Sequence, residues 1–295
     1  METFVRLRDD LSEQIRYNSA GYPIYIRETR FEQPQCFAIP NHWHDDLELI
    51  AVHSGQMLYY VNGESIPLTA GEGIIINARQ IHYNFATGNA PCPFSCILLH
   101  PMLLCATAAY EHEMVQPVLN GPPWFKLASD DPWGQSILEE IRRISTANAT
   151  AAAPLRTLSS FAAIWAALYD HVMRDPPAQT APGNELTIVR NMLAFIQSHY
   201  AERITLAQIA AAGAIGQSKC CKLFQRYLRQ TPNAYLTQFR LSKSVELLRS
   251  DLSITEIAYA TGFGSSSYYA ETFRRYMGQP PSAYRAALSV EPPVI

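Results

Sequence analysis

The chain of 295 residues lacks the features that mark membrane and secreted proteins. It has no run of about 18 consecutive apolar residues, which argues against a transmembrane helix. No apolar signal-peptide core is present in its N-terminal stretch, METFVRLRDDLSEQ. Its six cysteines follow no regular framework, so we expect free thiols rather than a disulfide scaffold. These absences predict a cytoplasmic protein with no membrane partner.

Charge is scarce and unevenly distributed. Charged residues make up 17% of the chain, and its net charge is −3. Residues 187–295 carry 12 Lys/Arg and 6 Asp/Glu, whereas residues 1–186 carry 11 and 20. Only the C-terminal part is therefore basic. This favours a polyanionic partner such as DNA, although a basic solvated surface would have the same composition.

Residues about 20–100 have the pattern of short β-strands separated by turns. The expected strands include Leu47–His53, Gln56–Val61, Ser65–Leu68, Gly73–Asn77 and Phe94–Leu99. Ser54-Gly55 and Asn62-Gly63 supply turn signals, because Asn and Gly tolerate positive φ. Short strands at this spacing are typical of a small antiparallel barrel or sandwich. We expect an antiparallel β-barrel domain over residues 1–128.

Helical periodicity begins after the strands. Asp131-Pro132 reads as a helix start followed by regularly spaced isoleucines, and Leu155–Met173 repeats the helical pattern. We assign residues 129–174 to helices that cover the barrel or pair with a second subunit. Residues 175–186 have the composition of a linker, and residues 289–295 form a tail.

The C-terminal part contains an internal repeat. Ile204-Thr-Leu-Ala-Gln-Ile-Ala210 returns as Leu252-Ser-Ile-Thr-Glu-Ile-Ala258 at an offset of 48 residues, and later matches fall at 49. Each copy reads as a helix, a tight turn and a second helix, followed by a proline that opens the next helix. Thr205 and Ser253 stand where they would cap the first helix. The repeat predicts two helix-turn-helix motifs in an all-α domain at residues 187–288.

The second helix of each copy is the predicted recognition helix, Gln217–Leu228 and Ser265–Met277. Both have an apolar inner face and a polar, partly basic outer face. The outward side chains are Ser218, Lys219, Cys221, Lys222, Gln225 and Arg226 in the first copy and Ser266, Ser267, Tyr268, Glu271, Arg274 and Arg275 in the second. Pro232–Arg249 would join the copies as a helix about 27 Å long, which suits major-groove segments about 34 Å apart. A duplicated helical bundle is the alternative, but two copies with basic outer faces favour DNA binding.

Residues about 188–287 resemble the DNA-binding domain of AraC/XylS-type transcription regulators. The resemblance is strongest in DLSITEIAYATGFGSSSYYAETFRRYMGQPPSAYR, residues 251–285, and weaker in the first copy. It implies a seven-helix domain that places both recognition helices in consecutive major-groove segments. The positions that it implies face bases are Ser218, Cys221, Lys222, Ser266, Ser267, Tyr268 and Glu271. The family usually has glycine where Arg229 stands, so Arg229 must end its helix without the residue that favours left-handed φ.

Glu271 departs from the family, which often carries arginine there. A glutamate would repel phosphate, so it either accepts a hydrogen bond from cytosine N4 or pairs with Arg274 or Arg275. We assign Arg226, Arg274 and Arg275 to phosphate contacts, which position a protein on DNA without specifying sequence.

The N-terminal stretch His42-Trp-His44-Asp-Asp-Leu-Glu48 carries three side chains of metal-ligand type. With Gly55 it fits the first motif of the cupin superfamily, and the second motif is partly present up to His82. Resemblance to cupins implies that His42, His44, Glu48 and His82 project inward from neighbouring strands. Three imidazoles and a carboxylate suit Zn, Ni, Mn or Fe.

Three interpretations of these residues remain open. They line an effector pocket without metal, together with Tyr59 or Tyr83; they bind a divalent transition metal; or they are structural and hydrogen-bond the neighbouring backbone. N-terminal domains of AraC/XylS-type regulators resemble cupins and often carry a similar stretch. That resemblance implies a small effector, frequently a sugar, bound without catalysis.

The predicted function is a ligand-responsive, sequence-specific DNA-binding transcription regulator, by resemblance an activator. We expect a homodimer that binds double-stranded DNA and a small-molecule effector, contacts RNA polymerase as the family does, and requires no cofactor. No enzyme activity is expected, because the DNA-binding half accounts for the chain without it. The rival interpretations are a metal-dependent cupin enzyme fused to a DNA-binding domain, and a DNA-binding protein whose barrel serves only dimerisation.

Overall fold

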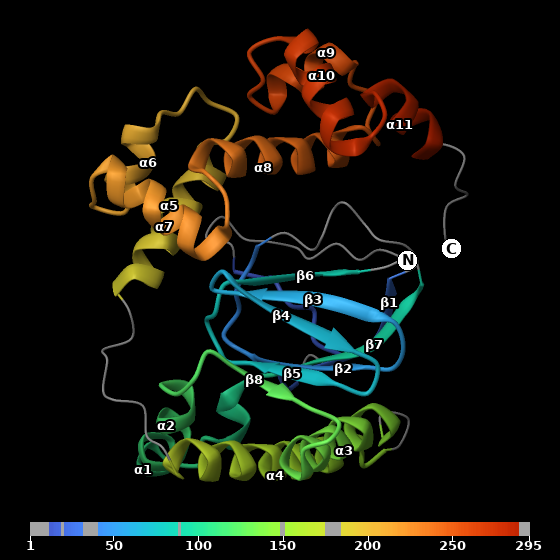
Figure 1. The fold of residues 1–295 in the computed structure, drawn as a ribbon, viewed down its shortest axis with the longest axis vertical. Coiled ribbons are helices and arrows are strands. Elements are labelled where there is room, and N and C mark those ends of the chain that lie inside the picture. Colours follow the sequence, from blue (N-terminus) through green and yellow to red (C-terminus); the bar gives the residue numbers. More distant parts are fainter. Residues whose placement is uncertain are drawn as a thin grey trace. The chain divides into compact units, whose positions relative to one another are not determined.

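The computed structural model describes residues 12–18, 21–31, 41–87, 90–147, 151–174 and 184–288. The chain divides between Asn184 and Glu185 into two compact units, which are described one at a time (Figure 1). In the described ranges, no helix combines the length and the apolar character that crossing a membrane requires. Most of the predicted linker, the predicted tail and Cys36 lie outside the described residues.

Antiparallel strands form the centre of the first unit. They are β1 (Ile24–Phe31), β2 (Leu47–Val52), β3 (Gln56–Val61), β4 (Glu64–Thr69), β5 (Gly73–Ile76), β6 (His82–Ala86), β7 (Cys92–Leu99) and β8 (Trp124–Leu127). A five-stranded sheet has the order β1-β7-β2-β5-β8, and a three-stranded sheet has the order β4-β3-β6. The predicted turns are confirmed, because Gly55, Asn62 and Gly63 all have positive φ.

Helices cover the outer face of the five-stranded sheet (Figure 1). The helical elements of this unit are α1 (Ala108–Tyr110), α2 (Gln116–Leu119), α3 (Pro132–Ala147) and α4 (Ala153–Arg174), with a 3-10 turn at Pro101–Leu104 and a π-helical turn at Glu111–Val115. Leu47 and Leu49 of β2 pack in one core with isoleucines of α3 and with Trp165 of α4. Ile50 of β2 faces the other way, into a second core shared with the three-stranded sheet. The layers are therefore helix, sheet, sheet.

The closed barrel predicted from the sequence is not formed by the described strands. The reason is β8, which the sequence did not reveal: it pairs with β5 and occupies the edge that closure onto β4 would need. Only side chains join β8 to β4, where Trp124 donates to Glu64 and Lys126 donates to the carbonyl of Pro67. An isolated bridge between His42 and His82 links the chain before β2 to the three-stranded sheet.

The described part of the second unit is helical. Its helices are α5 (Asn184–His199), α6 (Leu206–Ala212), α7 (Gln217–Leu228), α8 (Pro232–Leu247), α9 (Ile254–Ala260), α10 (Ser266–Met277) and α11 (Pro281–Leu288). Thr205 and Ser253 cap α6 and α9, and each forms a reciprocal capping box with the residue three positions later. Both predicted caps are therefore confirmed.

The two predicted recognition helices correspond to α7 and α10. Phe224 of α7 and Phe273 of α10 are fully buried, and Phe263 is the buried plug of the second turn. Arg229 ends α7 with φ of 55°, so it adopts the left-handed conformation that the sequence required of it.

Candidate functional sites

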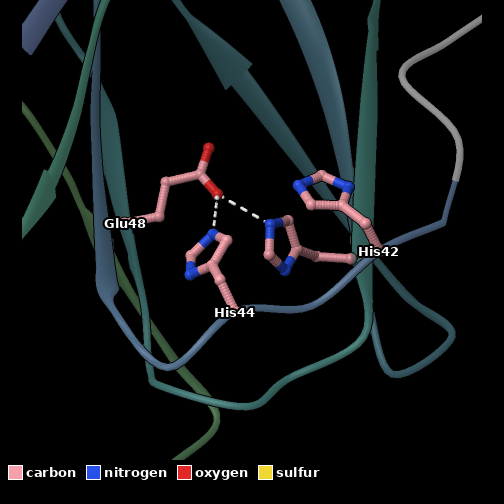
Figure 2. A group of neighbouring side chains, drawn as sticks. His42, His44 and Glu48 are labelled. Atoms are coloured by element: carbon pink, nitrogen blue, oxygen red, sulfur yellow. Dashed lines mark hydrogen bonds and ion pairs between the residues drawn. The ribbon is translucent and has the colours of Figure 1, made fainter. Parts of the chain in front are cut away.

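Four residues from the predicted pocket come together inside the first unit. His42 and His82 are opposite one another in an antiparallel bridge, which brings their ring centroids to 4.3 Å. His44 follows on the same segment and Glu48 lies on β2, and Figure 2 shows His42, His44 and Glu48 pointing toward one another. One potential ligand atom from each of the four side chains lies within 4.8 Å of the others, and all four residues are buried. His82 lies 34 to 40 positions after the other three residues in the sequence. It joins their cluster because β6 lies beside the segment that leads into β2.

Backbone carbonyls determine the tautomer of two imidazoles. His44 Nδ1 lies 3.0 Å from the carbonyl oxygen of Asp46, and His82 Nδ1 lies 2.9 Å from that of Gln80. A carbonyl oxygen only accepts, so each Nδ1 carries a proton, and in the neutral ring each Nε2 keeps its lone pair. These Nε2 atoms lie 3.4 Å and 2.7 Å from Glu48 Oε2. Lone pairs directed at a carboxylate require a proton or a cation between them.

The ionised forms of Glu48 and of the histidines beside it stabilise one another. Burial alone would raise the pKa of the Glu48 carboxyl, but His82 and His44 hold that pKa well below its usual range. Burial alone would lower the pKa of His44, but its hydrogen bond to Glu48 and the nearby carboxylates raise it above the ordinary value. The interior therefore accommodates positive charge beside an ionised glutamate.

The donor set fits a transition-metal ion. Three imidazoles and one carboxylate match the ligand preferences of zinc and neighbouring metals. The hydrogen bonds from Nδ1 to backbone carbonyls are the kind of outer contact that orients histidine ligands in metal sites. His82 Nε2 is a buried atom without a hydrogen bond of suitable geometry, as expected of a nitrogen whose lone pair can coordinate a cation.

Further polar groups surround Glu48, and the sequence indicated only one of them. Tyr59 of β3 is fully buried and its hydroxyl donates to Glu48 Oε1 at 2.8 Å. Cys96 of β7 lies 3.9 Å from the same oxygen. Asn84 of β6 is buried, and its Oδ1 has no hydrogen-bond partner. Tyr83, the alternative to Tyr59, belongs to the opposite face of β6 and stacks on Tyr60.

An N-terminal segment also reaches the cluster. Glu13 is held by a backbone hydrogen bond to Trp43, and its carboxylate lies 3.7 Å from His42 Nε2. Burial raises the pKa of Glu13 to about 7. Tyr17 donates to buried Asp46 at 3.1 Å. No sequence motif connects residues 12–18 to the histidines, because only the tertiary fold brings them together.

The predicted DNA-facing side chains lie on the outer sides of α7 and α10. Ser266 is half-buried, and the exposed ones are Ser218, Cys221, Lys222, Gln225, Arg226, Ser267, Tyr268, Glu271, Arg274 and Arg275. Their exposure leaves these side chains accessible to a duplex.

The first recognition helix has an acidic neighbour that the sequence did not indicate. Glu185, on the first turn of α5, lies 2.9 Å from Arg226 Nη1 and 3.9 Å from Lys219 Nζ. The expected alternative for Glu271, a pair with Arg274 or Arg275, does not occur among the ion pairs of the described residues. The cytosine contact of Glu271 stays a prediction.

Comparison with known families matches each unit separately. A family model described as "Cupin domain" matches residues 32–98, and one described as "Helix-turn-helix domain" matches residues 209–287. The first match contains the histidine and glutamate cluster, and the second contains both recognition helices.

Similar proteins match this chain over most of its length. The uncharacterized HTH-type transcriptional regulator YdeC of Bacillus subtilis (strain 168) is 28% identical over 97% of this chain and 99% of its own length. The melibiose operon regulatory protein of Escherichia coli (strain K12) is 26% identical over 96% of this chain and 95% of its own. Among solved structures, ToxT from Vibrio cholerae strain SCE256, bound to an unsaturated fatty acid, has 14% identity and a TM-score of 0.48, and covers 92% of this chain and 97% of its own.

Proposed function

We propose, from the premise that this chain belongs to the AraC/XylS-type family of transcription regulators, that its two units divide recognition between a small effector and DNA. The chain is a DNA-binding transcription regulator and not an enzyme: the relatives named above are regulators, and the helix-turn-helix match covers both recognition helices. The observation that carries the proposal is the pairing of a buried polar cluster in one unit with two exposed recognition helices in the other.

On DNA, α7 and α10 enter two consecutive major-groove segments. Lys222 and Ser218 of α7 and Tyr268 of α10 face bases, while Arg226 and Arg275 contact phosphates. The support is their exposure on helices whose opposite faces are buried. Base contacts specify sequence, whereas phosphate contacts position the protein.

Two substitutions test this division on duplex DNA selected by the full-length protein from a random library. Lys222→Ala should weaken binding to the selected site by about 10-fold to 100-fold, and binding to random DNA much less. Arg275→Ala should weaken both and reduce the slope of log affinity against log salt by about one. Equal losses on both DNAs for Lys222→Ala would make it a phosphate contact.

The cluster in the first unit supplies the side chains that contact the effector. Its buried groups, His42, His44, Glu48, His82 and Tyr59, offer both donors and acceptors to a polar ligand. A sugar or related metabolite suits this chemistry, since hydroxyl groups can satisfy donors and acceptors together. The relation to a melibiose operon regulator supports a carbohydrate.

A divalent transition metal is a second occupant that the same residues fit. His42, His44, Glu48 and His82 would hold it, and it would supply a Lewis-acidic point for an oxygen atom of the effector. The protein's own part is to orient His44 and His82 through Asp46 and Gln80, and to exclude water by burial.

Metal content and thermal stability of the purified full-length protein test these two occupants. The unfolding temperature is measured with mono- and disaccharides, melibiose included, and with Zn, Ni, Mn, Fe or EDTA. A sugar that raises the unfolding temperature of the wild type but not of Glu48→Gln supports the pocket. Glu113→Gln is the control, because this exposed glutamate lies on the π-helical turn and is not a member of the cluster. Stoichiometric metal with turnover of a sugar would contradict the regulator proposal.

Residues 129–174 mediate a homodimer in this proposal. Leu155 and Met173 of α4 are 72% and 48% exposed, so α4 has apolar side chains that a second subunit can cover. Effector binding then shifts the population of dimer geometries and so the pairs of DNA half-sites that are reached. Activation through RNA polymerase is the outcome expected of the family. Sedimentation of Leu155→Glu as a monomer, against a dimeric wild type, is the expected result.

A further inference from the structure

Two arginines of the second unit hold backbone carbonyls in the same manner. Arg240 of α8 donates from Nε to the carbonyl of Tyr200 at 2.7 Å and from Nη2 to that of Glu202 at 2.7 Å. Arg285 of α11 donates from Nε to the carbonyl of Leu248 at 3.1 Å and from Nη2 to that of Leu252 at 2.6 Å. Each arginine thus holds the segment that precedes a helix-turn-helix, α5 to α6 in one case and α8 to α9 in the other. Charged donors make such hydrogen bonds strong.

Arg240 differs from Arg285 because it also meets the other copy. The turn between α9 and α10 passes so close that a Cβ on Gly262 would lie 2.9 Å from Arg240 Nε and 2.4 Å from the carbonyl oxygen of Tyr200. Gly262 has φ of +80°, a conformation that favours glycine. The turn of the second copy therefore rests directly on the backbone after α5 and on the guanidinium that holds it.

Packing around this contact leaves little freedom. The ring of Tyr200 packs edge-on against Phe239 of α8 at 5.2 Å. Phe263, next to Gly262, is buried, and its ring lies 5.9 Å from that of Tyr268 on α10. The contact thus continues from α5 and α8 into the second recognition helix.

We propose that Arg240, with Tyr200, Glu202 and Gly262, forms a joint that locks the two helix-turn-helix copies into one rigid reader of DNA. We name these four residues the Arg240 joint. Its role is positioning: Arg240 touches no base, but it sets the angle and distance between α7 and α10. The inference rests on the proposed docking of both helices and adds a property to it, namely that the domain reads the spacing of its two DNA elements as well as their sequence.

The geometry of B-DNA makes spacing a sensitive quantity. One helical turn contains about 10.5 base pairs over about 34–36 Å, so one inserted pair shifts an element by ~3.4 Å and ~34° around the axis. A rigid reader cannot follow both changes and loses one set of contacts. A domain with a loosened joint can follow both changes. Its two recognition helices are less ordered before binding, so ordering them costs binding free energy.

The test is a spacing series on DNA selected from a random duplex library by the full-length wild type. For the wild type, one inserted base pair between the two selected elements should weaken binding about 30-fold, the size of a lost set of base contacts. Arg240→Met should bind the native spacing less tightly and lose only about 3-fold on insertion. Arg285→Met is the matched control: it removes an equivalent pair of arginine–carbonyl hydrogen bonds, those between α11 and the segment from α8 to α9, and should keep the wild-type spacing ratio.

The outcomes separate the joint from the proposed docking. A selected site with a single element would overturn two-groove docking and the joint with it. Two elements, with the same insertion penalty in Arg240→Met as in the wild type, would overturn the joint alone. If Arg240→Met does not fold, Arg240→Lys, which keeps the charge but has one donor nitrogen in place of the two that Arg240 uses, should give an intermediate spacing ratio, and an unchanged ratio overturns the proposal.

A second readout needs no DNA. Spin labels on exposed Cys221 of α7 and on Ser267→Cys of α10, with Cys36 and the half-buried Cys96 and Cys105 replaced by serine, report the distance between the recognition helices. We expect a narrow distance distribution in the parent and in Arg285→Met, and a broad one in Arg240→Met. Equal widths in all three would contradict the joint.

Discussion

Corresponding positions of the two helix-turn-helix copies have the same backbone conformation but different residue types. The first turn has Ala214 at φ of 54°, where the second has Gly262 at 80°. The recognition helix of the first copy ends at Arg229, with φ of 55°, and that of the second ends at Gly278, with 75°. At the start of these helices, Gly216 offers no side-chain cap, whereas Ser265 accepts a hydrogen bond from the backbone of Tyr268.

At all three positions the second copy has the residue that the local geometry favours. A left-handed conformation costs a residue with a Cβ about 1–2 kcal/mol, and glycine adopts it without that cost. The first copy must therefore obtain these conformations from its packing, in which Cys220, Leu223 and Phe224 of α7 are buried. Local sequence specifies the second copy, and tertiary contacts specify the first.

The copies also differ in the partners of their cations. Glu185 pairs with Arg226 and contacts Lys219 in the first copy. The described residues hold no ion pair to Arg274 or Arg275 of the second copy. In the proposed complex with DNA, Arg226 exchanges a carboxylate for a phosphate, while Arg274 and Arg275 give up only solvent and counterions.

The largest effect is expected from placing the first copy's alanine in the second copy. Gly262→Ala would put a Cβ 2.4 Å from the carbonyl oxygen of Tyr200 in a left-handed conformation, so the second unit should lose about 3 kcal/mol or more of its free energy of unfolding. Urea denaturation of the full-length protein, followed by far-UV circular dichroism, measures it. The reverse exchange in the first copy, Ala214→Gly, should leave the free energy of unfolding unchanged or raise it. A loss of the same size in both variants would contradict the comparison.

An exchange at the helix ends should give smaller effects of opposite sign. Nothing lies within 4 Å of a Cβ at Gly278, so Gly278→Ala should destabilise by backbone strain alone, about 1 kcal/mol. Arg229→Gly should relieve the same strain and stabilise the first copy by a similar amount. The same urea titration serves both. If Arg229→Gly destabilises the protein, Arg229 holds the end of α7 through contacts of its side chain.

The smallest effect concerns the acidic neighbour of the first copy. Glu185→Gln should raise affinity for duplex DNA up to about 5-fold, because an exposed ion pair contributes about 0–1 kcal/mol. The salt dependence should steepen, since Arg226 then releases only counterions. Fluorescence anisotropy at several salt concentrations measures both quantities. Asp251→Asn removes the same charge from an exposed site outside the Arg240 joint and should raise affinity less; an equal gain would assign the effect to net charge.

Much of the fold could be predicted from local signals. The expected boundaries of β3, α7 and α10 agree with the structure, with Ser265 as the cap of α10 rather than its first residue. Turn residues and helix caps act over a few positions, which explains this agreement. The strand β8 and the short helical turns between Pro101 and Leu119 were not anticipated, because such segments are too short to show a period.

The sites were predictable in part for the same reason. Motif spacing identified His42, His44, Glu48 and His82, and the outer faces of the repeat identified the candidate DNA contacts. Glu13, Asn84 and Cys96 were missed around the pocket, as were Glu185 and Arg240 in the second unit. None of these belongs to a local pattern; each acquires its role from a partner distant in the chain.

The sequence by itself determined the division into a cupin-like part and a duplicated helix-turn-helix, because periodicity, turn residues and motif spacing are local properties. Only the tertiary structure decided that the strands form two sheets rather than a closed barrel, since β8 occupies the edge that closure would need. It also decided that Nε2 atoms of two histidines converge on Glu48, and that the turn at Gly262 rests on Arg240. Apart from the pair His44 and Glu48, these features depend on contacts between residues more than 20 positions apart, where the packing of whole elements sets the distances.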